Sequence, residues 1–138
     1  MISSSKRNLG IVALLGSLVL GGVALAQNAA PEAKRTILGR IDQTGVPDKE
    51  IVIGTAELPA GAAIGWHTHN GDEDGYVLKG DLVLKVKGQP DRVLKAGDFF
   101  FNARGTVHSL IAAPGTAGGT ALSSWIIDKG KPLADPVK

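Results

Sequence analysis

The stretch Gly61–Gly80, "GAAIGWHTHNGDEDGYVLKG", places two histidines two residues apart, with an acidic cluster behind them. Residues i and i+2 of an extended strand point the same way, so His67 and His69 share one face. Asn70-Gly71 is a turn dipeptide, which predicts that the chain reverses and brings Glu73 back beside the imidazoles. Two imidazoles and a carboxylate are suitable ligands for a first-row divalent metal. A solvated polar loop can have the same composition, so both interpretations stay open at this point.

The third and last histidine, His108, lies in the segment "GDFFFNARGTVHSLIA" at residues 97–112. In a closed antiparallel barrel, strands distant in sequence face each other across the interior, so His108 could supply a third nitrogen. The chain contains no cysteine. Any transition-metal site must therefore use nitrogen and oxygen ligands, and the fold has no disulfide to support it.

From residue 36 onward, short apolar runs alternate with turn residues, and no sustained helical periodicity appears. This pattern predicts an all-β sandwich or barrel. The alternation is clearest in "LVLKVK", where Leu82, Leu84 and Val86 share one face. The predicted strands are residues 36–41, 50–57, 64–69, 73–79, 81–87, 91–95, 98–102, 106–112 and 120–127.

Both histidine segments resemble the two motifs of the cupin superfamily. The first motif is G-(x)5-H-x-H-(x)3,4-E-(x)6-G, and its defined positions are occupied by Gly61, His67, His69, Glu73 and Gly80. The second is G-(x)5-P-x-G-(x)2-H-(x)3-N, which is matched by Gly97, Gly105 and His108, while Ala103 replaces its proline and Ala112 its asparagine. Neither replaced residue is a metal ligand in the family.

The resemblance implies a cupin double-stranded β-helix, which is a small jelly-roll barrel. It also implies that His67, His69, Glu73 and His108 hold one divalent transition metal, without distinguishing Fe, Mn, Ni, Cu or Zn. Gly61 and Gly80 would lie at tight turns, and Gly71 would let the hairpin bend.

Two functions are consistent with that resemblance. The first is a small metalloenzyme that carries out a dioxygenase-like oxidation of a small substrate, with catalytic residues unknown. The alternative is a non-catalytic module that binds a metal or small ligand in the periplasm. In either case, the resemblance implies a small-molecule ligand and a homodimer formed through edge strands.

The N-terminal residues have the pattern of a secretory signal peptide. Lys6 and Arg7 precede an uncharged run, residues 9–26, which ends in Ala24-Leu25-Ala26. The run is just long enough for an uncleaved membrane anchor, but its glycines and small-residue ending favour cleavage after Ala26. Lys6-Arg7 also bears a faint likeness to a twin-arginine signal, so the export route stays open.

Cleavage predicts a periplasmic or secreted protein without stable membrane association. We divide the chain into a signal peptide (1–26), a polar leader (27–35), a barrel domain (36–128) and a C-terminal tail (129–138). Two of the 15 basic residues, Lys6 and Arg7, lie in the predicted signal peptide, so the rest of the chain has 13 basic and 13 acidic residues. This balance, without a Lys/Arg block, gives no basis for nucleic-acid binding.

Several other residues are candidates for the surroundings of the site. Leu110 shares the face of His108, and Phe99 and Phe101 lie opposite Phe100, although the pattern does not decide which face lines the barrel. Trp66 and Tyr76 flank the ligands, and we expect both to be buried scaffold. Arg104 either grips a carboxylate at the mouth of the barrel or is a solvated loop residue.

Overall fold

The computed structural model describes residues 29–138, and every regular element in that range is a β-strand. The strands are β1 (Lys34–Asp42), β2 (Lys49–Pro59), β3 (Ala63–Thr68), β4 (Gly71–Val86), β5 (Arg92–Lys95), β6 (Phe99–Asn102), β7 (His108–Ala112), β8 (Gly118–Asp128) and β9 (Asp135–Pro136). The predicted signal peptide lies outside the described residues. Within them, no helix is long and apolar enough to span a bilayer.

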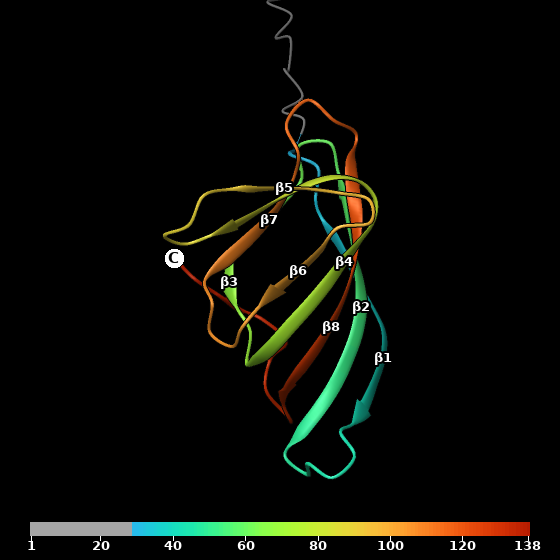
Figure 1. Ribbon diagram of the computed structural model, residues 1–138, viewed down its shortest axis with the longest axis vertical. Coiled ribbons are helices and arrows are strands. Elements are labelled where there is room, and N and C mark those ends of the chain that lie inside the picture. The colour runs from blue at the N-terminus through green and yellow to red at the C-terminus, as the bar shows by residue number, and fades with distance from the viewer. Residues whose placement is uncertain (1–28) are drawn as a thin grey trace, which may run out of the picture.

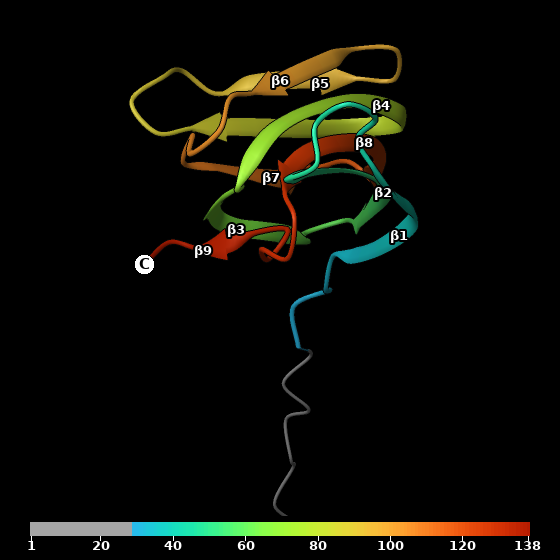
Figure 2. The same ribbon diagram turned by 90° about the horizontal axis from the view of Figure 1, so that it is seen from below.

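The strands form one antiparallel, strongly curled sheet with the order β1-β2-β8-β4-β7-β3-β9. β5 and β6 each pair with β4 outside this path. Figure 1 shows the long strands β1, β2, β8 and β4 running side by side, and Figure 2 shows the curl end-on. The predicted all-β, jelly-roll class is confirmed.

The longest strand, β4, joins the two halves of the curled sheet. Residues 71–80 pair with β8, and residues 82–86 pair with β7. The change of partner occurs at Gly80, which has φ 74° and whose Cβ would lie 2.0 Å from the carbonyl oxygen of Gly118. Only glycine fits that conformation and that close approach. The predicted strands 73–79 and 81–87 are therefore one bent strand.

The segment after His69 is a corner between the two halves of the curled sheet and not the predicted hairpin. β3 pairs with β7 and β9, while β4 pairs with β8, β6, β5 and β7, so β3 and β4 are not partners. Gly71 does not have a positive φ. It is required for a different reason, because a Cβ there would lie 1.7 Å from the carbonyl oxygen of Ile126.

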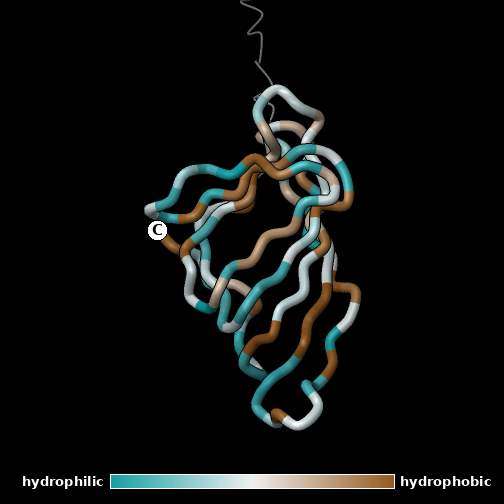
Figure 3. Tube along the Cα trace, in the orientation of Figure 1, coloured by the Kyte–Doolittle hydropathy of each residue, from teal (hydrophilic) through white to brown (hydrophobic). Residues whose placement is uncertain are grey.

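The core lies inside the curl and follows the predicted alternation along β4. Leu82 and Leu84 are buried with Leu110, and Val86 packs against them. Burial of each leucine contributes about 2 kcal/mol of hydrophobic stabilisation. A second, smaller cluster joins Val52, Trp125 and Ile127 to Leu133 of the C-terminal segment. Figure 3 shows the alternation of hydrophobic and hydrophilic residues along the long strands.

The C-terminal segment is part of the folded structure. Its strand β9 pairs with β3, and the backbone N–H of Val137 donates to the carbonyl oxygen of Trp66. The side chain of Asn70 donates to the carbonyl oxygen of Pro132 and to the carboxylate of Asp135. These contacts tie the segment 129–138, which the sequence analysis separates as a C-terminal tail, to the end of the histidine strand.

Candidate metal centre

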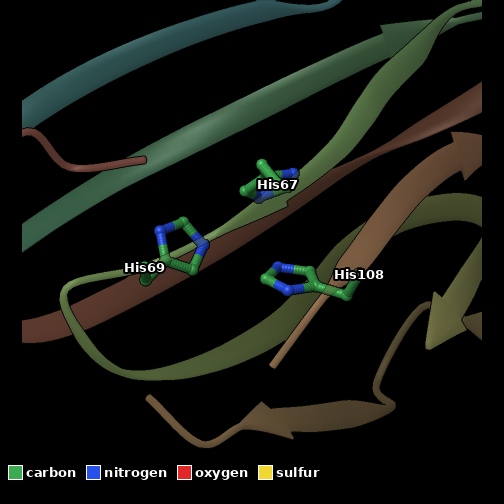
Figure 4. A group of neighbouring side chains, drawn as sticks. All are labelled: His67, His69 and His108. Carbon is green, nitrogen blue, oxygen red and sulfur yellow. The ribbon is translucent and has the colours of Figure 1, made fainter. Parts of the chain in front are cut away.

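The three histidines converge inside the barrel from two neighbouring strands. His67 lies in β3, His69 follows the end of that strand, and His108 begins β7, where it pairs with His67. The ring centroids of His67 and His108 are 4.2 Å apart, and those of His69 and His108 are 5.0 Å apart. All three side chains are buried, and one nitrogen of each lies within 4.8 Å of the others (Figure 4).

Backbone carbonyl groups fix the orientation of all three imidazoles. The Nδ1 atom of His67 lies 2.7 Å from the carbonyl oxygen of Gly65, and that of His108 lies 2.9 Å from the oxygen of Thr106. The Nδ1 atom of His69 lies 2.6 Å from the carbonyl oxygen of Leu133, in the C-terminal segment. A carbonyl oxygen only accepts hydrogen bonds, so each Nδ1 carries the proton. The Nε2 lone pairs are left for the interior of the cluster.

The carboxylate of Glu73 joins the cluster from β4. Its Oε2 atom lies 3.1 Å from Nε2 of His108 and 3.3 Å from Nε2 of His69. The buried amide of Asn102 donates to the same oxygen at 2.9 Å, because Asn102 in β6 pairs directly with Glu73. Burial raises the pKa of the Glu73 carboxyl, but the close approach of His108 and His69 and the hydrogen bond from Asn102 lower it by more. The pKa therefore lies well below its usual range, and Glu73 is ionised.

The electrostatic surroundings keep His67 neutral. Burial lowers the pKa of the His67 imidazole to about 4, and the neighbouring His108, His69 and Arg35 act in the same direction. The hydrogen bond with Gly65 opposes them but does not prevail. His67 is thus neutral at pH 7 and has a free lone pair, as a metal ligand requires.

A small cavity of about 10 Å³ adjoins the cluster, which is room for about one water-sized sphere. The side chains of His67, Glu73 and His108 line it on one side. The remaining walls are formed by Arg35, Ala56, Ile64, Leu84, Phe100, Leu110, Ser123 and Trp125. The cavity therefore has the size of a single ion, with aliphatic and aromatic walls around a polar centre.

The four residues predicted as ligands, His67, His69, Glu73 and His108, lie together in this cluster. Arg35, Asn102 and Trp125 also lie at the site and were not predicted from the sequence. Asn102 offered a signal, because it lies in phase with Phe100 in the run "FFFN" and so shares its inward face. Arg35 was assigned to a polar leader, although it is the second residue of β1.

The expectation that Trp66 and Tyr76 are buried is wrong, since they are 43% and 47% exposed. Strand alternation explains both cases, because the parity that directs His67 and Glu73 inward directs Trp66 and Tyr76 outward. Alternation along β6 likewise buries Phe100 and exposes Phe99 and Phe101. Asp72 and Asp74 are exposed, on the opposite face of β4 from Glu73.

Arg104 is exposed, and its guanidinium forms a fork with Asp128 at 2.9 Å and 2.6 Å. This ion pair accounts for Arg104 without a ligand. Its hydrogen bonds, together with that from Lys49, hold the pKa of the Asp128 carboxyl below its usual range.

A curled antiparallel barrel whose interior holds three histidines and a carboxylate defines the class of this protein. The family model for the cupin domain matches residues 54–125, which is more than half of the chain. The chain belongs to the cupin family. A comparison with curated proteins gave no match.

Solved structures give the same fold. The DMSP lyase DddQ from Ruegeria pomeroyi is similar with a TM-score of 0.60 and 22% identity, over 76% of this chain and 51% of that one. This chain thus spans about half the length of that relative. A cupin-like protein from Thermotoga maritima gives a TM-score of 0.54 at 23% identity, over 76% and 75%. KdgF from a Halomonas species gives a TM-score of 0.53 at 22% identity, over 75% of this chain and 87% of that one. At these identities the likeness concerns the fold alone.

Proposed function

We propose that the cluster binds one divalent first-row transition metal through the Nε2 atoms of His67, His69 and His108 and the carboxylate of Glu73. The observation that carries this proposal is the direction of the three imidazoles. Each Nδ1 proton is held by a backbone carbonyl, so the three Nε2 atoms present lone pairs and face a carboxylate oxygen in a buried space. The lone pair of His69 also accepts a hydrogen bond from the indole N–H of Trp125. Carbonyl partners of this kind orient histidine ligands and raise their basicity.

The electrostatics of the cluster call for a cation. The lone pair of His108 Nε2 lies 3.1 Å from the ionised oxygen of Glu73, and that of His69 lies 3.3 Å away. Two acceptors at that distance repel each other unless a proton or a metal lies between them. A divalent ion satisfies all four groups at once, whereas a single proton satisfies one pair. Nitrogen and oxygen ligands suit Fe, Mn, Ni, Cu or Zn.

Beyond metal binding, we propose that the protein is a small metalloenzyme. Three nitrogens and one oxygen leave two of six octahedral positions free, where a bound metal would supply Lewis acidity or reactivity toward dioxygen. We infer a dioxygenase-like oxidation of a small substrate. The second candidate is a non-catalytic module that holds a metal or small ligand, and the ion-sized cavity of about 10 Å³ favours it.

The metal content of the untagged chain tests the first proposal. After isolation from its native compartment, we expect about one equivalent of transition metal by mass spectrometry. The chain has three histidines and no cysteine, so background binding is small. His108→Ala and Glu73→Gln should lose tight binding while retaining the β-sheet circular dichroism spectrum. Asp74→Asn, which changes an exposed neighbouring carboxylate, should retain the metal. Tight stoichiometric binding by His108→Ala would overturn the assignment.

Dioxygen consumption distinguishes the metalloenzyme from the non-catalytic binding module. Metal-loaded protein is mixed with small phenolics and small organic acids, and oxygen uptake is followed with an electrode. Uptake that requires both metal and substrate, and that His108→Ala lacks, supports the enzyme. A metal-loaded protein that binds these compounds without consuming oxygen or forming products supports the binding module.

We propose further that the protein is exported after removal of residues 1–26. The uncharged run behind Lys6 and Arg7 and its Ala24-Leu25-Ala26 ending support this proposal. N-terminal sequencing of the protein from the periplasm or culture medium should begin at Gln27. Recovery of the intact chain in the membrane fraction would indicate an uncleaved anchor.

The predicted homodimer stays a proposal, and the exposed edge strand β6 is its most suitable site. Phe99 and Phe101 are 70% and 56% exposed there, and β6 pairs only with β4 among the described strands. An exposed apolar edge favours pairing with a second copy. Analytical ultracentrifugation should give a dimer for the wild type and a monomer for Phe99→Glu/Phe101→Glu. A monomeric wild type would contradict the proposal.

A further inference from the structure

Arg35 carries a positive charge beside the proposed metal site, and the site chemistry described above does not use it. It is the second residue of β1, where it pairs with Ala56 of β2. Its side chain lines the same cavity as His67, Glu73 and His108. Its guanidinium carbon lies 5.8 Å from the centroid of the Trp125 ring, a cation–π contact beside the cluster.

The guanidinium has no hydrogen-bond acceptor within residues 29–138. Its Nε atom is buried and unpartnered, and none of its nitrogens lies within 4.0 Å of a carboxylate oxygen from that part of the chain. The other arginines there are engaged: Arg40 pairs with Glu50, Arg92 donates to the carbonyl oxygen of Phe99, and Arg104 pairs with Asp128. Arg35 is the exception among them.

Glu73, whose charge acts on Arg35, does not supply it with a hydrogen-bond acceptor. The Oε2 atom of Glu73 already accepts a hydrogen bond from Asn102 and lies beside His69 and His108. Glu73 raises the pKa of Arg35 through its charge, but burial lowers that pKa by more. A partly buried guanidinium with free donors is destabilising unless a ligand supplies acceptors. The cation–π contact uses the charge and leaves the N–H donors free.

Arg35 also lies at the entrance to the cluster. A second hollow of about 230 Å³ opens on the surface and is lined by Ala33, Arg35, Ala63 and Ile64. Arg35 and Ile64 border both this hollow and the inner cavity. A molecule in the hollow is thus within reach of the guanidinium, which also lines the cavity beside the histidines. The hollow is smaller than a typical drug-sized pocket, so its occupant has only a few heavy atoms.

We propose that Arg35 binds the carboxylate of a small organic anion that enters through this hollow and reaches the metal site. The proposal rests on the metal function above and adds the chemical class of its ligand, a short-chain carboxylate. The planar fork of a guanidinium matches a carboxylate in bidentate geometry, which a lysine cannot reproduce. The carboxylate would satisfy the free donors, including the buried Nε.

Acetate and its neutral counterpart acetamide test the proposal. Binding of each is measured by calorimetry and by Trp125 fluorescence, in metal-free and in Co(II)-loaded protein. We expect acetate to bind more tightly than acetamide. Arg35→Gln should weaken acetate binding about 10- to 100-fold and leave acetamide binding unchanged. Arg35→Lys keeps the charge but not the planar fork, so its acetate affinity should lie between those of the wild type and Arg35→Gln.

The matched control is Arg40→Gln, which lies on the same strand but whose guanidinium is paired with Glu50. It should leave acetate binding unchanged.

Stability provides a second readout, since Arg35→Met removes an unpaired partly buried charge and should raise the melting temperature of the metal-free protein. Arg40→Gln leaves Glu50 buried without its partner and should lower the melting temperature. Acetate binding by Arg35→Gln that equals the wild type would overturn the proposal.

Failure of the metal proposal gives a different result. If the wild type holds no metal but acetate still binds in an Arg35-dependent way, the metal function is wrong and the carboxylate site stands. If Arg35→Gln retains one equivalent of metal and loses no acetate affinity, the metal function stands and the carboxylate site is wrong.

Discussion

The indole N–H of Trp125 donates a hydrogen bond to Nε2 of His69 across 3.3 Å. Nδ1 of His69 is already bound to the carbonyl oxygen of Leu133, so the indole occupies the one lone pair that a metal would need. Trp125 in β8 is buried, and its ring centroid lies 5.7 Å from that of His69. The indole is therefore both a competitor for the ligand nitrogen and a reporter of its occupation.

Metal binding should change the fluorescence of Trp125. We expect a buried, blue-shifted emission from the metal-free protein and strong quenching by one equivalent of Cu(II), Ni(II) or Co(II). The second tryptophan, Trp66, is half exposed, so Trp66→Phe isolates the signal of Trp125. Titration of Trp66→Phe should end at one equivalent. Equal quenching in Trp66→Phe/His108→Ala would show that the signal does not report on the cluster.

Removal of the competing donor should not weaken the metal site. In Trp125→Phe, His69 Nε2 has no hydrogen bond to give up, so we expect metal affinity equal to the wild type or up to about 5-fold tighter. The smaller ring leaves a gap beside Val52 and Ile127, and the free energy of unfolding should fall by about 2 kcal/mol. Competition with a fluorescent chelator measures the affinity. A 10-fold loss of affinity would contradict this account of Trp125.

Asn102 should set the metal affinity through Glu73. Its amide donates to Oε2 of Glu73 at 2.9 Å, and both side chains are buried. Replacement of the residue that orients a ligand typically weakens binding about 10- to 100-fold. We expect Asn102→Ala to lose affinity by that factor while keeping the one-to-one stoichiometry, whereas Glu73→Gln loses tight binding. Unchanged affinity in Asn102→Ala would show that Glu73 needs no support.

The sequence predicts the barrel because its signals are local. Turn residues and the alternation of Leu82, Leu84 and Val86 depend only on neighbours along one strand. The inward direction of His67 and His69 follows from the same parity. Glu73 was placed correctly by a wrong route, since a hairpin was expected and β4 instead pairs with β8 and β6. Proximity in sequence was enough because the corner between the strands is short.

The surroundings of the cluster depend on pairing between distant strands. Asn102 meets Glu73 through the β4–β6 register, and Trp125 meets His69 from β8, which is 56 residues away. Leu133 reaches His69 from a segment that looked like a polar tail. Curling of the sheet sets these contacts, and no single strand carries a pattern that reports them. The four motif positions were identifiable, whereas the residues that orient them were not.

A methyl group at Gly71 should disrupt the corner that positions Glu73. A Cβ there would lie 1.7 Å from the carbonyl oxygen of Ile126, and this backbone cannot move without breaking the β4–β8 pairing. We expect Gly71→Ala to reduce the free energy of unfolding by about 3 kcal/mol or more. The control is Gly65→Ala, since a Cβ at Gly65 meets no atom within 4 Å and φ is not positive there. Urea unfolding followed by circular dichroism gives both values, and equal stability of the two variants would contradict the close approach.

The metal-free protein should lose stability as the pH falls from 6.5 toward 4. The pKa of His67 is about 4 in the folded protein and 6.5 in the unfolded chain, so within this window the unfolded state binds more protons. The free energy of unfolding must then decrease with decreasing pH, by about 2 to 3 kcal/mol in all, and level off below pH 4 for this group. Glu73, whose folded pKa is also lowered, adds to the loss only below its ordinary pKa of 4.5. Urea unfolding of chelator-treated protein at several pH values measures the slope, and His67→Asn should flatten it between pH 6.5 and 5. A slope that persists unchanged in His67→Asn would assign the titration to another group.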